Sequence, residues 1–453
     1  MFKHLLRPRV AAFTLAIACL TAGTLAPVGN ARAADAPQFI PQWLGAQYTF
    51  IDQHQSSLHS PYAGALSLRA QGDTARSDTF GAYFGVALPA RLQFYVDVEM
   101  FKGGGVSGGS GLGGGVNGDV IRSGSGGNSK RAYVARRYLR WTLPLGGGTA
   151  AVTRAQDQLP GQQAAQRLEV KLGKMSVGDD FDRNRYANSA RTQFMNWALI
   201  NGTAWDFAAD THGYTDGLVL ALAEPGWRLR YGVYRMPVMA NGQTLVSSLR
   251  RARGEQVQLT LQPDPDGWAL RLLAFRNIAA MGVYRNALAQ AEAGGGVPVV
   301  QSDDRPGRHK YGYALNGELP LADGGDTGLF FRAGWNDGRT ESFAYTEVDR
   351  TLSAGMQLSG THWARPTDHL GLALVANGLS PDHRAYLAAG GSGFLLGDGA
   401  LNYAQEEIAE LYYSYAPFAH VSFSPDLQWI RNPGYNRDRG PVTFAGVRAH
   451  LEF

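Results

Sequence analysis

Residues 446–453 read Gly-Val-Arg-Ala-His-Leu-Glu-Phe, and this pattern decides the fold class. Every second residue from Val447 to Phe453 is apolar, and the residues between them are charged, polar or glycine. Side chains of a β-strand point alternately to opposite faces, so a period of two places the apolar set on one face. The stretch therefore predicts a strand with one apolar and one polar face.

The same alternation recurs along the chain, for example in residues 168–173, 256–261 and 328–336. In a soluble sandwich the apolar face would form the core, whereas in a membrane barrel it faces lipid and the polar face lines water. Strands are predicted near residues 43–52, 79–88, 92–101, 132–143, 167–176, 211–223, 227–238, 254–263, 268–279, 310–320, 327–336, 351–360, 369–378, 405–416, 420–431 and 441–453.

The connections between these strands alternate in length. Short connections lie at 89–91, 224–226, 264–267, 321–326 and 417–419. Long connections lie at 53–78, 102–131, 177–210, 280–309 and 379–404. Short periplasmic turns and long extracellular loops are typical of an outer-membrane barrel. Residues 144–166 break the pattern, and either a missed pair of strands or a periplasmic excursion would explain them.

The composition also indicates a barrel. The chain has 58 Gly, 20 Tyr, 20 Phe and 9 Trp, with only 18% charged residues, below the roughly 25% of soluble domains. Only a closed sheet or a helix satisfies every backbone group in lipid. We therefore predict an all-β fold, a transmembrane antiparallel β-barrel of about 16 strands. Tryptophans near strand ends would form its interfacial girdle: Trp43, Trp141, Trp227, Trp268 and Trp335.

The first 33 residues have the features of a signal peptide. Lys3, Arg7 and Arg9 precede an apolar stretch, and Ala31-Arg32-Ala33 offers the small residues that a signal peptidase reads. We predict cleavage after Ala33, which leaves residues 34–453 as the barrel domain. An uncleaved anchor, or a lipoprotein signal cut at Cys19, is the alternative.

Removal of residues 1–33 changes the charge balance. The segment holds four of the 42 basic residues and no acidic residue, so 38 of each sign remain. A neutral mature chain gives no argument for binding nucleic acid. It also lacks cysteine, which excludes disulfide-stapled folds and thiol enzymes.

No motif indicates catalysis, a metal or a cofactor. The Gly-rich stretch 103–127 contains Gly109-x-Gly111-x-x-Gly114, but no βαβ unit surrounds it, and we interpret it as a flexible loop. Asp179, Asp180 and Asp182 lack the ligand spacing of a calcium loop. We predict a protein that is not an enzyme.

The polar faces of the strands carry charged side chains of both signs. Such charges are costly in hydrocarbon, so they are expected to face a water-filled lumen, where they either select solutes or only pair with one another. The predicted pore-lining residues are Arg136, Tyr138, Arg140, Glu169, Lys171, Arg228, Arg230, Arg271, Arg332 and Arg448.

Five stretches resemble the carbohydrate-selective porins of Gram-negative outer membranes, within a similarity from about Trp43 to Phe453. The stretches are Lys171–Leu199, Asp206–Thr215, Arg332–Asp349, Asn377–Tyr403 and Asn432–Val442. The resemblance implies a sixteen-stranded barrel for passive uptake of sugars, with loops folded inward to narrow the pore.

The resemblance also implies an inward loop at Val177–Asp210. Its predicted constriction residues are Asp180, Asp182, Arg183, Arg191, Asn196 and Trp197. The chain departs from the family pattern at Ser189-Ala190, where Asp-Pro is expected, and in an expanded Gly-rich loop. Both departures bear on pore width or sugar preference.

Phe453 resembles the terminal signal read by the barrel-assembly machinery. The expected protein is an outer-membrane porin for mono- and small oligosaccharides, in contact with outer-membrane lipid, as a monomer or a homo-oligomer. A general or anion-preferring porin is the alternative, favoured by the arginine excess. Two further alternatives are an outer-membrane enzyme and a secreted soluble β-protein. The enzyme would need a group of catalytic side chains at the barrel rim, and none is found in the sequence. The soluble protein is excluded if the mature chain can be extracted only with detergent.

Overall fold

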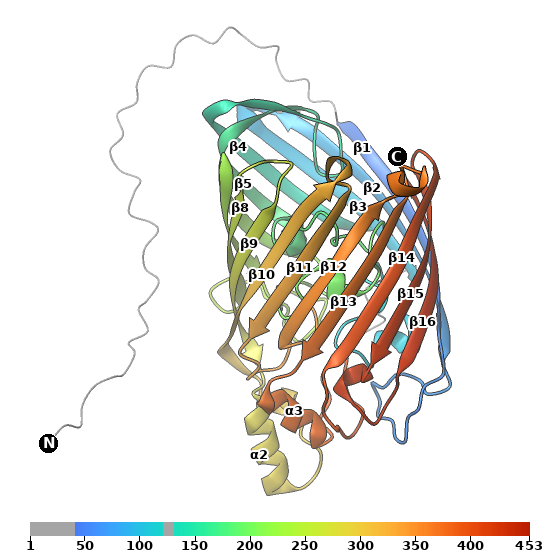
Figure 1. Cartoon of the computed structure of the whole chain (residues 1–453). Coiled ribbons are helices and arrows are strands. Elements are labelled where there is room, and N and C mark those ends of the chain that lie inside the picture. The colour runs from blue at the N-terminus through green and yellow to red at the C-terminus, as the bar shows by residue number, and fades with distance from the viewer. Residues whose placement is uncertain (1–40, 121–130) are drawn as a thin grey trace, which may run out of the picture. The chain divides into compact units, whose positions relative to one another are not determined.

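Sixteen antiparallel strands form a closed barrel in the computed structural model, which describes residues 41–120 and 131–453. Each strand pairs with its sequence neighbours, and β1 pairs with β16 to close the sheet (Figure 1). The strands are β1 Gln42–Gln55, β2 Asp73–Leu88, β3 Leu92–Gly103, β4 Tyr133–Val152, β5 Gly161–Met175, β6 Thr215–Glu224, β7 Gly226–Arg235, β8 Arg253–Gln262, β9 Ala269–Met281, β10 Arg305–Ala322, β11 Thr327–Asn336, β12 Arg350–Ser359, β13 His369–Gly378, β14 Glu406–Phe418, β15 Val421–Arg431 and β16 Val442–Glu452. The predicted barrel is confirmed. The predicted signal peptide 1–33 and residues 121–127 of the Gly-rich stretch lie outside the described residues.

Strand β11 illustrates why the alternating sequence forms this barrel. Leu329 and Phe331 point outward and are 40% and 38% exposed, whereas Arg332 between two outward positions is 1% exposed. Arg332 is paired across the sheet with Asn316 of β10 and Ser353 of β12, which are also buried inside. Apolar groups therefore cover the outer surface and polar groups the interior, the reverse of a soluble sandwich.

Short turns join the strands at one end of the barrel and long loops at the other, as Figure 1 shows. Residues 89–91 and 419–420 are examples of the short turns, and residues 176–214 form the longest described loop. The C-terminus lies at the end with the short turns (Figure 1). In an outer-membrane barrel the short turns lie on the periplasmic side.

Residues 144–166 form a hairpin that extends β4 and β5 beyond the neighbouring strands. Thr149 to Val152 pair with Ala164 to Gly161, so these residues continue β4 and β5. The explanation that this segment contains an additional pair of strands is therefore wrong. Register shifts near Gly146 and Thr149 bend the hairpin, and Gly146, Gly147 and Gly148 have φ of 136°, 76° and 78°. Glycine adopts such positive φ without steric cost, which explains the triple glycine at the bend.

The tip of this hairpin, residues 153–160, folds back into the barrel. The Gln156 side chain donates to Asp97 of β3 (2.9 Å), and the backbone N–H of Leu159 donates to the Tyr95 hydroxyl (3.3 Å). Leu159 is 5% exposed. The interior of the barrel is therefore occupied from the short-turn end as well as from the loop end.

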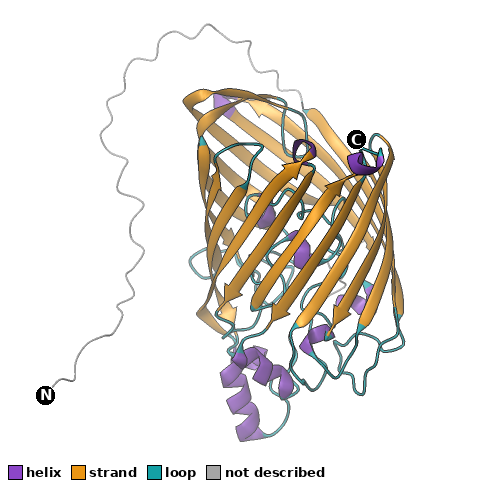
Figure 2. Cartoon of the chain, in the orientation of Figure 1, coloured by secondary structure: helices purple, strands orange, loops and turns teal. Residues whose placement is uncertain are grey.

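The helices are short and belong to the connections. Figure 2 shows α2 and α3 beyond the strands at the end with the long loops, where Tyr284 stacks on His383 with ring centroids 4.4 Å apart. None of the helices within the described residues has the length and apolar character needed to cross a membrane. The α-helices are α1 Trp197–Ile200, α2 Tyr284–Gly294 and α3 Pro381–Ala388. The 3-10 helices are η1 Pro89–Arg91, η2 Val106–Gly109, η3 Val177–Asp179, η4 Val300–Asp303, η5 Asp323–Gly325, η6 Gly360–Trp363 and η7 Pro433–Tyr435.

Candidate pore constriction

The loop between β5 and β6, residues 176–214, crosses the interior of the barrel (Figure 2). It contacts β8 through Gln258, β11 through Arg332, β14 through Glu410 and β16 through Arg448. Strands β8 and β16 lie half a barrel apart in the strand order. We call residues 176–214 the inward loop.

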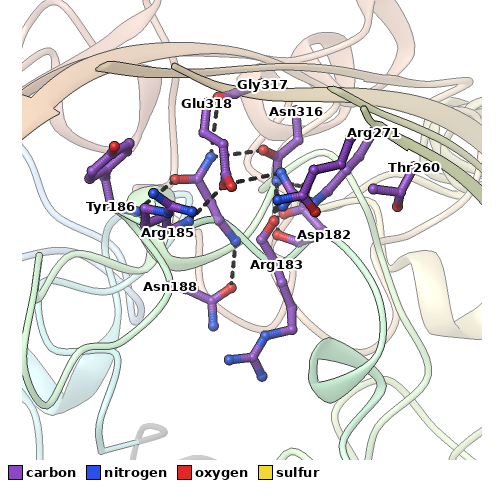
Figure 3. A network of polar contacts seen from close by, with 12 residues as sticks. Asp182, Arg183, Arg185, Tyr186, Asn188, Thr260, Arg271, Asn316, Gly317 and Glu318 are labelled. Carbon is purple, nitrogen blue, oxygen red and sulfur yellow. Dashed lines mark hydrogen bonds and ion pairs between the residues drawn. The ribbon is translucent and has the colours of Figure 1, made fainter. Parts of the chain in front are cut away.

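Asp182 attaches the inward loop to one side of the wall. Its carboxylate accepts from Arg332 Nε (3.0 Å), Asn316 Nδ2 (2.7 Å) and the backbone N–H of Gly202 (2.7 Å). Arg332 also donates to the backbone carbonyl groups of Asp182 and Ala187, and Figure 3 shows Asp182 and Asn316 within this network. Asp182 and Arg332 have side chains 2% and 1% exposed. Both predicted site residues are therefore placed as supports of the loop.

Arg448 and Asn196 attach the inward loop to the opposite side. Arg448 donates to the carbonyl oxygens of Ala190 and Gln193, both at 2.7 Å. The backbone N–H of Asn196 donates to Glu410 (3.1 Å), while its side chain accepts from Ala198 N–H and so caps α1. Ala190 contacts Arg448 through its backbone, so this contact does not depend on the side chain at the position where the chain departs from the family pattern.

Trp197 packs under the Gly-rich loop and is 6% exposed. Its ring lies 5.0 Å from Tyr345, and a Cβ on Gly118 would come within 2.7 Å of it. Val116 is 4% exposed in the same region. The interpretation of this stretch as a flexible loop is therefore wrong for residues 104–120, where glycine allows close packing.

Arg136 of β4 joins three segments of the chain. It forms ion pairs with Asp97 of β3 (3.2 Å), with Asp157 of the hairpin tip (3.4 Å) and with Asp179 of the inward loop (2.8 Å). Burial alone would raise the pKa of Asp179, but the Arg136 charge brings it below its ordinary value. Burial raises the pKa of Asp157. The inward loop and the hairpin tip therefore meet at one guanidinium.

Arg191 lies beside this junction. It pairs with Asp119 of the Gly-rich loop (2.6 Å) and with Glu99 of β3 (3.5 Å). Burial acts against its charge, but Asp119 and Glu99 hold the pKa of Arg191 well above its ordinary value. The side chain is 20% exposed, so part of the guanidinium faces open space.

The other predicted residues divide into paired and unpaired groups. Lys171 pairs with Asp180 (2.7 Å), and Arg271 pairs with Glu318 (3.1 Å). Arg167 pairs with Glu169, and Arg140 donates to Gln93 and to the hydroxyl of Tyr95, a ring that stacks on Tyr138. Arg183, Arg228 and Arg230 form no ion pair with any residue in the described ranges. Arg183 is exposed, and Figure 3 shows its guanidinium directed away from the network.

Three acidic residues that pair with Arg136 or Arg191 were not predicted from the sequence: Asp97 and Glu99 of β3 and Asp157 of the hairpin tip. Asp97 and Glu99 alternate with Val96 and Val98 on β3, so the period of two could have assigned them to the interior. No comparable pattern marks Asp157, which reaches the interior only because the hairpin folds back. Among the described residues no group of three His, Cys, Asp or Glu side chains could hold a metal ion.

The family model "Carbohydrate-selective porin, OprB family" matches residues 90–453. The chain belongs to this family. With the closed sixteen-stranded barrel, membership of the OprB family makes the protein an outer-membrane porin, a channel rather than an enzyme. No curated protein sequence matches the chain.

One solved structure shares the fold of this OprB-family chain, and two more are reported as similar to it. The high-pH structure of Pseudomonas putida OprB has a TM-score of 0.68 at 17% identity and covers 91% of this chain and 94% of that one. The low-pH structure of the same protein has a TM-score of 0.47 at 12% identity, with coverages of 91% and 92%. The outer membrane channel DcaP of Acinetobacter baumannii has a TM-score of 0.49 at 10% identity, with coverages of 91% and 97%.

Proposed function

We propose that this porin admits mono- and small oligosaccharides by passive diffusion, through a lumen narrowed by the inward loop and the hairpin tip. The observation that carries the proposal is the junction at Arg136, where Asp157 from the periplasmic side and Asp179 from the opposite side share one guanidinium. A passage bounded by two such segments admits only small solutes. It is lined by donors and acceptors that suit sugar hydroxyls.

The predicted constriction residues take two roles in this proposal. Asp182, Asn196 and Trp197 are buried and hold the inward loop in place. Arg183 and Arg191, together with the paired Asp180, contact the passing solute. A loop held by buried, satisfied polar contacts keeps one width, as selection by size requires.

The test is solute uptake into liposomes that contain the purified mature protein. Glucose and a disaccharide are compared with amino acids and organic anions of similar size. We expect glucose to enter faster than the amino acids and the organic anions that are not sugars, and Arg191→Gln to change the ratio of glucose to disaccharide. The matched control is Arg76→Gln, because Arg76 pairs with Asp52 and is 71% exposed. Entry governed by size or charge alone would overturn the sugar preference.

A general or anion-preferring porin is the second candidate. It is favoured by three of the predicted constriction and pore-lining arginines, whose side chains form neither an ion pair nor a hydrogen bond with any described residue: Arg183, Arg228 and Arg230. The reversal potential in a gradient of potassium chloride separates the two. A reversal potential near zero favours the sugar porin. A reversal potential that shows strong selectivity for chloride over potassium favours the second candidate.

The remaining proposals concern assembly. We propose cleavage after Ala33, recognition of Phe453 by the barrel-assembly machinery and insertion into outer-membrane lipid. Phe453 is 66% exposed, and its N–H and carbonyl both pair with Ala46 of β1 (2.9 and 3.1 Å), which supports a role in closing the barrel. Whether the barrel forms a homo-oligomer is tested by the mass of the detergent-extracted protein.

A further inference from the structure

The register of the sheet aligns four arginines in one cross-strand row. Arg167 of β5 pairs with Ala223, which pairs with Arg228 of β7, and that residue pairs with Thr260. The row continues from Thr260 to Arg271 of β9, then through Asn316 to Arg332 of β11. Every second strand from β5 to β11 therefore contributes an arginine, with about 10 Å between neighbours along the row. We call Arg167, Arg228, Arg271 and Arg332 the arginine row.

Small or short polar side chains separate these arginines. Ala223 lies between Arg167 and Arg228, and Ala221 lies beside Arg230. Both alanines face the interior and are 5% exposed or less. Because neither fills space above the sheet, the guanidinium groups of β7 have room on the lumen side.

The centre of the row carries positive charge that no described residue neutralises by an ion pair. Arg228 and Arg230 are only partly buried, and the Nε of Arg228 is buried without a hydrogen-bond partner in the described protein. Arg230 interacts electrostatically with the carboxylates of Asp180 and Glu169 and, more weakly, with the guanidinium of Arg183, and the two carboxylates already pair with Lys171 and Arg167. By contrast, Arg167, Arg271 and Arg332 each have a carboxylate partner. Among the arginines of the row and of the predicted constriction, Arg228 and Arg183, together with Arg230 on the same strand as Arg228, are therefore the ones whose guanidinium groups have neither an ionic nor a hydrogen-bonding partner among the described residues.

This charge lies near the periplasmic end of the lumen. Arg228 is the third residue of β7, which begins directly after the short turn at residue 225, and Arg271 is the third residue of β9. A solute that has passed the inward loop therefore meets these arginines before it leaves the barrel.

We propose that Arg228, Arg230 and Arg183 form a binding site for the carboxylate of an acidic monosaccharide. A guanidinium fork matches a carboxylate with two parallel hydrogen bonds, and an uncompensated cluster gains most from an anion that completes the pairing. Thr260, the register partner of Arg228 on β8, offers a hydroxyl on the same face of the sheet. The proposal rests on the proposed sugar porin and adds a second substrate class to it.

The experiment compares glucose with glucuronate, which differ by one carboxylate on the same ring. Both are labelled, and uptake is measured in liposomes that hold the full-length mature barrel and a potassium ionophore, so that charge does not accumulate. The variants are Arg228→Gln/Arg230→Gln and, separately, Arg183→Gln. The matched control is Arg276→Gln/Arg431→Gln, which removes two exposed arginines that pair on the outer surface with Glu255 and Glu407.

We expect wild type to admit glucuronate at least as fast as glucose. The β7 double variant should lower glucuronate uptake by roughly fivefold, the effect of two unit charges at about 8 Å in water, and leave glucose uptake within about twofold. Arg183→Gln should lower glucuronate uptake about twofold. The outer control should change neither rate.

An unchanged ratio of glucuronate to glucose in the β7 double variant overturns the site. A fall in chloride permeation without a fall in glucuronate uptake also overturns it, because the cluster would then act on inorganic anions only. Failure of the sugar porin itself has a different signature, since glucose would then show no advantage over an amino acid of equal size in wild type. Retained glucose uptake in the double variant shows that the barrel is folded.

Discussion

Arg332 is a residue whose charge supports the inward loop from within the barrel wall. It donates to the Asp182 carboxylate and to the carbonyl groups of Asp182, Ala187 and Leu199. A buried pair of this kind contributes little relative to an apolar pair, but removal of one partner leaves the other charge uncompensated. The position therefore tolerates loss of its charge poorly.

Replacing Arg332 tests this support. Arg332→Gln should destabilise the inward loop by about 3–5 kcal/mol, because Asp182 stays buried without its cation. Single-channel conductance should rise and fluctuate, and proteases should cut within residues 176–214. Arg276→Gln, at an exposed pair, should cost less than about 1 kcal/mol and leave conductance unchanged. A quiet channel of wild-type conductance in Arg332→Gln would contradict the supporting role.

Glu341 is a residue whose protonation is linked to the order of two loops. It lies in the connection 337–349, is 3% exposed and accepts from the backbone N–H of Gly282 (2.8 Å). Burial raises its pKa to about 8, and the charge of Asp304 acts in the same direction. The folded loops therefore hold this proton more tightly than the unfolded chain does.

The sign of the pH dependence follows from this raised pKa. Stabilisation by the proton is complete below the ordinary value of 4.5 and is lost as pH rises through about 8. Limited proteolysis of residues 282–304 and 337–349 should be faster at pH 9 than at pH 6. Glu341→Gln should remove the difference, whereas Glu407→Gln, on an exposed side chain, should keep it. Equal cleavage of wild type at both pH values would refute the linkage.

At the scale of elements, the β4–β5 hairpin is the unusual feature. Turns at this end of such barrels are short, yet here the strands continue past the rim and the tip returns to Asp97, Tyr95 and Arg136. These contacts place residues 153–160 inside the periplasmic mouth. In the proposed function the hairpin is a second restriction beside the inward loop.

Shortening the hairpin measures this contribution. Val152 and Gly161 are paired, so residues 153–160 can be replaced by Asn-Gly, which forms a two-residue hairpin turn. Conductance should increase, and the ratio of disaccharide to glucose uptake should rise, because the periplasmic mouth widens. Arg154→Gln changes an exposed charge in the same tip and should leave both unchanged. Unaltered conductance after the replacement would show that the tip does not limit passage.

At the scale of the whole molecule, the outer surface carries the proposed contact with membrane lipid. Leucine is the most frequent of the exposed large apolar residues, with examples such as Leu374 in the middle of β13 (61%) and Leu321 at the periplasmic end of β10 (57%). These two residues have similar exposure but different depth in the barrel. Replacing each of them by a charged residue therefore compares the free-energy cost of a charge at two depths in the membrane.

The same substitution at the two depths should have unequal effects. Leu374→Arg should reduce the free energy of unfolding by about 2–4 kcal/mol, and Leu321→Arg by about 0–1 kcal/mol, because the midplane is the least hydrated region. Unfolding in denaturant, with the protein in lipid vesicles, measures both. Equal costs would argue against a membrane centred on the strands.

The sequence alone was sufficient for the barrel. The alternation of Val447, Leu451 and Phe453 with Arg448 and His450 is a local property, because the residues of a strand by themselves show which of its faces is apolar and which is polar. All sixteen strands, and the alternation of short turns and long loops in most connections, were predicted from this local pattern. The helices α2 and α3 were not predicted, because they lie in loops that carry no such period.

The roles of the interior residues depended on the tertiary structure. The alternation correctly turned Arg228 and Arg332 inward, but only the packing of the inward loop decides that Arg332 is neutralised by Asp182 and Arg228 is not. The partners come from segments 150 residues apart in the chain, as for Arg332 and Asp182. A period of two assigns a side chain to a face, whereas its partner depends on how distant loops fold across the lumen.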